Sequence, residues 1–152
     1  MLLTAAHFHV AGVYLLIVLG RITHDRGRVA AAIALACVLS VPLTAAGIYG
    51  PAWLEVAAAV GMAASGFSAG VLLVTTPGRA LRVAGAVLLL SMPLAGAFAL
   101  RDHGTSFSIL GFDPLGSMLI SHGVLNALAF AAISLVVLAR SPLPAGLVDE
   151  RR

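Results

Sequence analysis

Two histidines separated by one residue, His7 and His9, lie at the start of an apolar stretch near the N-terminus. His122 and Asn126, one helical turn apart, lie inside another apolar stretch near the C-terminus. Imidazole and amide groups are costly in apolar surroundings unless they bind one another or a ligand. An imidazole exchanges protons near neutral pH and also binds metals. These four residues are therefore candidates for acid-base or ligand chemistry.

Three charged residues at the ends of other apolar stretches complete the candidate set. Glu55 opens one stretch, and Arg101 and Asp102 follow another. Acid-base catalysis needs a proton donor and a proton acceptor whose pKa values are moved towards neutrality by burial or by neighbouring charges. An arginine can orient a carboxylate or stabilise a developing anion. The candidate catalytic residues are His7, His9, Glu55, Arg101, Asp102, His122 and Asn126.

Simpler interpretations compete with this one. Glu55 can be a solvated carboxylate at a helix N-terminus, where the helix dipole favours negative charge. Arg101 and Asp102 can form a surface ion pair, which contributes little to stability. His122 and Asn126 can be a structural joint between helices, because polar groups in an apolar bundle need hydrogen-bond partners.

The composition predicts the fold in which these residues must lie. The chain has 152 residues, of which 61% are hydrophobic and only 10% charged, and its mean hydropathy is +1.07. Such values are typical of an all-α integral membrane protein, and the length allows about five spans of roughly 20 residues. We expect one transmembrane helical domain over residues 1–141 and a short charged tail over residues 142–152. The expected location is the bacterial cytoplasmic membrane, crossed several times.

The apolar stretches predict five membrane-spanning helices, at about residues 7–22, 29–49, 53–75, 81–100 and 117–139. Pro42 and Pro93 fall inside two of them, where each removes a backbone hydrogen bond and favours a kink. The longest connection, residues 101–114, is apolar in its middle and reads as a lid over the bundle. Cys37 lies in an apolar stretch and is expected to pack in the core or against lipid.

The distribution of the basic residues predicts the orientation. All nine are arginine, and most lie in the connections at 21–28 and 79–82 and in the tail. Because cytoplasmic connections carry the excess of basic residues, this pattern places the N-terminus outside and the C-terminus inside. No basic face suited to nucleic acid is present. In this topology the seven candidate residues gather at the outer end of the bundle.

Three motifs resemble those of a known family. They are Ala6-His7-Phe8-His9-Val10-Ala11-Gly12, then Leu54-Glu55, then the stretch from His122-Gly123-Val124-Leu125-Asn126 to Phe130. In residues and order they resemble the YndJ-like bacterial membrane proteins, over nearly the whole chain. This resemblance implies no particular activity. The unit His7-Phe8-His9 also resembles the haem-ligating helix of haem-copper oxidase subunit I, but the oxidase's further histidines, copper site and helices have no counterpart.

Three classes of function follow from these residues. The favoured class is a membrane enzyme without a cofactor, which uses acid-base chemistry to cyclise or isomerise a lipophilic substrate or to open an epoxide. The second is a haem or transition-metal protein with the same histidines as ligands. The third is a non-catalytic transporter or accessory protein. Membrane lipid is the expected surrounding, and rows of small residues such as Ala57, Gly61, Ser65 and Ala69 leave packing within the chain or a homo-oligomer open.

Overall fold

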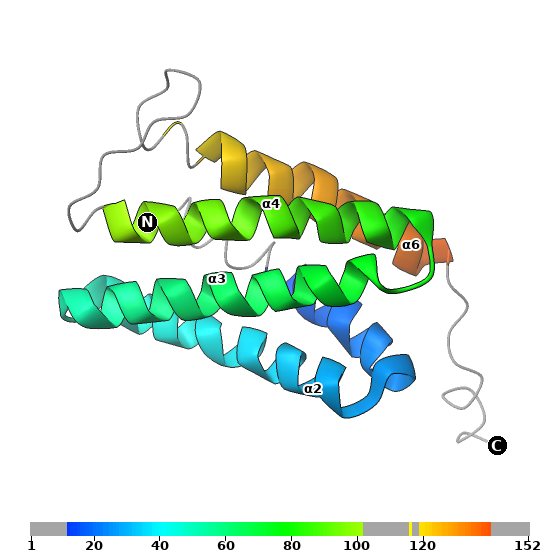
Figure 1. Ribbon diagram of the computed structural model, residues 1–152, viewed down its shortest axis with the longest axis horizontal. Helices are drawn as coiled ribbons and strands as arrows, with labels where there is room; N and C mark the ends of the chain where they lie inside the picture. The colour runs from blue at the N-terminus through cyan, green and yellow to red at the C-terminus, as the bar shows by residue number, and fades with distance from the viewer. Residues whose placement is uncertain (1–11, 102–115, 117–118, 141–152) are drawn as a thin grey trace.

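The computed structural model describes residues 12–101, 116 and 119–140 of the chain. Within these residues every element is helical, in the order α2 (Val13–Tyr49), α3 (Ala52–Val74), α4 (Arg79–Arg101), η2 (Leu119–Ala131) and α6 (Ala132–Arg140). In Figure 1 the helices run roughly parallel or antiparallel to one another as a bundle. The predicted all-α fold is confirmed.

Helix α2 consists of two limbs that reverse direction at Gly27. This glycine has φ of 64° and ψ of −146°, a non-helical conformation that residues with a side chain rarely adopt. Figure 1 shows the first limb, in dark blue, folding back into the lighter blue second limb. The polar stretch 21–28, predicted as a connection, therefore stays helical up to a sharp reversal. Next to it, Arg26 Nη2 donates a hydrogen bond to the carbonyl of Thr75, where α3 ends.

In the part of the chain that the structure describes, three helical segments are long and apolar enough to cross a membrane: Arg26–Tyr49, Ala52–Val74 and Arg79–Leu100, with 24, 23 and 22 residues. At about 1.5 Å per residue each exceeds the roughly 30 Å of a bilayer's hydrocarbon core. Two shorter apolar helices, Val13–Thr23 and His122–Val137, accompany them. The predicted bounds of the second, third and fourth spans agree with the observed helices to within a few residues. The start of the first span and the proposed lid lie mostly outside the described residues.

Large apolar side chains both fill the bundle and cover its outside. Leu19, Leu73, Leu88 and Phe130, from four different helical segments, are each at most 1% exposed. Leu35 and Leu90 belong to a large set of exposed apolar residues, and Trp53 is 70% exposed at the start of α3. An apolar exterior of this extent is suited to lipid surroundings, where burial in the bundle is not the only way to leave water.

Helices α3 and α4 approach each other closely through glycines. A Cβ atom on Gly85 would lie 2.8 Å from the Gly70 carbonyl oxygen, the Leu73 Cβ and the Val74 nitrogen. Further along the same contact, a Cβ on Gly96 would lie 3.3 Å from the Ala63 Cβ. Small residues allow this contact, as is common between helices in membranes. Gly70 and Ala63 make this contact on one face of α3, whereas a Cβ on Gly61, in the row of small residues noted in the sequence, would meet nothing within 4 Å.

This contact predicts that Gly85→Ala destabilises the protein by about 1 to 3 kcal/mol, because the added methyl group meets backbone atoms that cannot move aside without separating the helices. Gly61→Ala is the matched control, since a Cβ on Gly61 meets nothing within 4 Å. That substitution should leave stability unchanged or raise it by up to about 1 kcal/mol. Unfolding of the detergent-solubilised protein by heat or sodium dodecyl sulfate measures both. Equal stability of the two variants would contradict the close contact.

Candidate functional site

A chain of three buried polar side chains links α4 to η2. The Ser91 hydroxyl donates a hydrogen bond to Asn126 Oδ1 over 2.8 Å. Asn126 Nδ2 lies 3.1 Å from His122 Nδ1. Ser91, Asn126 and His122 are 0%, 1% and 8% exposed. The predicted association of His122 with Asn126 is therefore present, and α4 supplies a further partner.

The observed arrangement of the Asn126 amide corresponds to one tautomer of the His122 ring. Asn126 Nδ2 can only donate, so His122 Nδ1 accepts and the ring of a neutral His122 carries its proton on Nε2. If the side-chain amide of Asn126 rotated by half a turn, its oxygen would face His122 and its NH₂ group would face Ser91. The hydroxyl of Ser91 would then accept from Nδ2, and Oδ1 would accept from a protonated Nδ1. The same three side chains can therefore serve either tautomer of the ring and the imidazolium.

The backbone that carries His122 and Asn126 is a π-helix of 13 residues, Leu119–Ala131. It continues directly into α6, so both residues belong to one long helical segment that packs against α4. π-Helical hydrogen bonds run from residue i to i+5, which widens the turn, and such segments are frequent at functional sites. The wider turn still keeps residues four apart close enough for the bond between Asn126 and His122.

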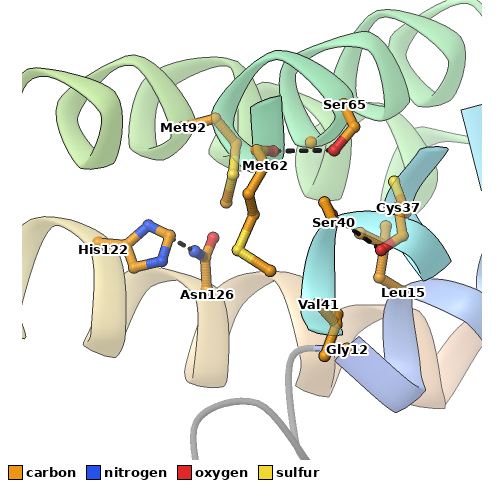
Figure 2. A pocket seen from close by; sticks show the side chains of 11 residues that line it. Gly12, Leu15, Cys37, Ser40, Val41, Met62, Ser65, Met92, His122 and Asn126 are labelled. Atoms are coloured by element: carbon orange, nitrogen blue, oxygen red, sulfur yellow. Dashed lines mark hydrogen bonds between the residues drawn. The ribbon is translucent and has the colours of Figure 1, made fainter. Parts of the chain in front are cut away.

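His122 and Asn126 form part of the wall of a small cavity between the helices, shown in Figure 2. Its volume is about 50 Å³, enough for a few water molecules at about 10 to 15 Å³ each by the same measure, or for one ion. Pockets for drug-sized ligands have several hundred Å³. The lining residues are Gly12, Leu15, Cys37, Ser40, Val41, Met62, Ser65, Gly66, Met92, His122 and Asn126.

The wall contributed by α2 and α3 contains hydroxyl and sulfur groups. The Ser40 hydroxyl donates to the Cys37 carbonyl over 2.8 Å, and the Ser65 hydroxyl donates to the Met62 carbonyl over 3.0 Å. These hydroxyls therefore bond to their own helices. The thiol of Cys37 and the thioether of Met62 belong to the same wall, and α4 adds the thioether of Met92. Among the described residues, no group of three or more His, Cys, Asp and Glu side chains could hold a metal ion.

Glu55 is the other candidate whose side chain the structure describes. It lies in the first turn of α3, is exposed, and does not line the cavity. Seven residues separate it from Met62, about 10 Å along the helix. A Cβ on Gly47 would lie 2.8 Å from the Glu55 Cα, so α2 and α3 touch at this point.

The remaining candidates lie at the end of α4 or outside the described residues. Arg101 is the last residue of α4, and its side chain is not among those described. His7, His9 and Asp102 lie outside the described residues. The structure thus brings together His122 and Asn126 from the predicted set.

Cys37, Met62, Ser91 and Met92 are among the residues at this site that were not candidates for it from the sequence. Ser91 had a recognisable signal, because it is the only polar side chain between Val83 and Leu100. A lone serine in such a stretch needs a partner. The two methionines had no signal, since they are ordinary residues in an apolar helix.

The chain was compared with known proteins. No curated protein and no solved structure matches it. The profile of the YndJ-like protein family matches residues 1–130, which include the motifs around His7, Glu55 and His122. Because this match covers most of the sequence, the chain belongs to the YndJ-like family.

Proposed function

We propose that the chain is a membrane enzyme in which His122 transfers protons to and from a lipophilic substrate, without a redox cofactor. The observation that supports this proposal is the buried set of hydrogen-bonded side chains Ser91, Asn126 and His122, which lies at the edge of a small cavity. A histidine in this position can be both base and acid within one catalytic cycle.

The proton transfer would proceed through the second arrangement of the Asn126 amide. With Nδ1 protonated and bonded to Asn126 Oδ1, the lone pair of Nε2 takes a proton from the substrate. The resulting imidazolium keeps its bond to Oδ1, which stabilises the charge in surroundings with little water. Nε2 then returns the proton to another atom of the same substrate, so the product is an isomer or a cyclised form of equal mass.

The size and lining of the cavity restrict how the substrate binds. A volume of about 50 Å³ admits a reactive group, with the remainder of a lipophilic molecule outside. Apolar side chains such as Leu15 and Val41 line part of it. Expulsion of water strengthens electrostatic interactions inside such a site. Membrane lipid is the proposed source of the substrate.

A second proton-transfer group is proposed from the sequence candidates. The described cavity lining contains no carboxylate. His7, His9 and Asp102 are retained for this role, with Arg101 to orient Asp102 or a developing anion. Glu55 is retained from the sequence as a candidate proton donor, with its exposed side chain in the first turn of α3 and outside the cavity lining.

The proposed location is the bacterial cytoplasmic membrane, crossed several times, with the N-terminus outside and the C-terminus inside. The reversal at Gly27, the turn after Thr75 and the end of α6 carry exposed arginines at one end of the helices: Arg26, Arg28, Arg79, Arg82 and Arg140. The positive-inside rule assigns this end to the cytoplasm.

Labelling of intact cells tests this orientation. In a Cys37→Ser background, an impermeant maleimide should label Ala52→Cys, which is exposed at the start of α3. It should label Pro77→Cys, exposed after the end of the same helix, only once the membrane is permeabilised. The reverse pattern would invert the proposed topology, and labelling of both in intact cells would exclude a membrane-spanning α3.

Hydrogen exchange tests the proposed chemistry. Lipids extracted from the native membrane are incubated in D₂O with the purified protein in nanodiscs, and mass spectrometry measures deuterium bound to carbon. We expect one lipid component to gain deuterium with the unaltered protein. His122→Gln should slow this gain at least 100-fold, because acid-base catalysis contributes about 10² to 10⁴ to a rate.

The control for this experiment is Ser68→Ala, which removes a hydroxyl that bonds to Ala64 of its own helix. It should exchange at the unaltered rate. Variants are compared only when their circular dichroism and thermal unfolding match those of the unaltered protein. Equal exchange with His122→Gln, or no exchange with the unaltered protein, would refute the proposed acid-base function.

A further inference from the structure

We propose that the cavity binds a soft monovalent metal ion, Cu(I), through the thioethers of Met62 and Met92 and the imidazole of His122. This site goes beyond the proposed acid-base function and does not depend on it. The three ligands come from α3, α4 and η2, so a bound ion would join three helices that are distant in sequence.

The arrangement of the two methionines supports this site. Figure 2 shows both side chains extending from their helices into the space beside Asn126 and His122. The thioether of Met92 packs against the backbone of α3, because a Cβ on Gly66 would meet first the Met92 Sδ and then its Cγ. Met62 Sδ lies 3.8 Å from the Thr44 hydroxyl. Glycine and threonine thus position the two thioethers from either side.

The ligand set determines which metal would bind. Thioethers are soft and uncharged, and they favour Cu(I) over the harder ions Mg²⁺, Ca²⁺ and Mn²⁺, which take carboxylates, carbonyls and water. The described lining holds no carboxylate that could balance a divalent charge. Because the free energy needed to bury an ion rises steeply with its charge, a monovalent ion suits three neutral ligands in an apolar bundle.

The buried polar chain supplies the hydrogen bonding that such a ligand needs. Metal-binding histidines usually donate their second ring N–H to an oxygen, which fixes the tautomer and the ring orientation. If Nε2 binds the ion, the ring proton moves to Nδ1 and Asn126 turns its Oδ1 towards it. Ser91 then accepts from Asn126 Nδ2. The ring stays neutral throughout, so binding releases no net proton.

Cys37 is not assigned as a ligand, although its thiol lines the same cavity. In Figure 2 it lies beside Ser40 and Leu15, on the opposite side of the cavity from His122. A thiolate ligand would bind with loss of a proton and would make the affinity depend on pH. The neutral set of two thioethers and one imidazole predicts an affinity that changes little between pH 7 and pH 8.5.

Competition with a chromophoric Cu(I) chelator under anaerobic conditions tests the site in the purified full chain. We expect one Cu(I) per chain. Met62→Leu and Met92→Leu should each lower the affinity at least tenfold, and the double variant at least 100-fold. Leucine is close to methionine in volume, and such exchanges cost less than about 1.5 kcal/mol. X-ray absorption should show sulfur and imidazole nitrogen bound to the copper.

Two controls make the result decisive. Cys37→Ser and Ser68→Ala should bind Cu(I) with unaltered affinity. No stoichiometric binding by the unaltered protein, or binding that survives Met62→Leu and Met92→Leu, would overturn the proposed site, as would loss of binding in Cys37→Ser alone. The chelator competition is read without any substrate, so its result in Met62→Leu and Met92→Leu tests the copper site separately from the deuterium exchange that tests the enzyme proposal. Ag(I), a soft ion without redox chemistry, should occupy the site and slow that exchange.

Discussion

The hydrogen bond from Ser91 to Asn126 is the constraint on which the arrangement of the site depends. It spans 2.8 Å between two helices and is shielded from solvent at both ends. If this bond broke inside the apolar bundle, neither polar group would find water as a new hydrogen-bond partner. The bond therefore fixes the rotation of η2 relative to α4. Through Asn126 it also sets the orientation of His122. The glycine contact between α3 and α4 holds together the two helices that carry Met62 and Met92.

Hydropathy alone predicted three of the five expected spans well, because each is a long uninterrupted apolar stretch. The predicted segment 53–75 corresponds to Ala52–Val74, and 81–100 corresponds to Arg79–Arg101. Two features were not predictable in this way. The reversal at Gly27 depends on one backbone conformation within a stretch that stays helical on both sides. The segment Leu119–Ala131 is a π-helix, and its apolar composition does not distinguish it from an α-helix.

The sequence predicted part of the site for a specific reason. His122 and Asn126 are four residues apart, so any helix brings them together, whereas Ser91 is 35 residues from Asn126 and is placed only by the packing of helices. Met62 and Met92 belong to the cavity for the same reason. Glu55 is the opposite case, a residue predicted for the site that does not line the cavity. It lies at the expected end of α3, but its side chain is exposed.

Proton transfer and metal binding both rest on one claim, that Asn126 holds the buried ring of His122 through Nδ1. Solid-state ¹⁵N NMR of histidine-labelled protein in bilayers tests it most directly, with His122→Gln used to assign the signal. The account predicts one protonated and one unprotonated ring nitrogen at neutral pH, and resonances that move in Asn126→Leu. An imidazolium with both nitrogens protonated, or resonances that Asn126→Leu leaves in place, would contradict it.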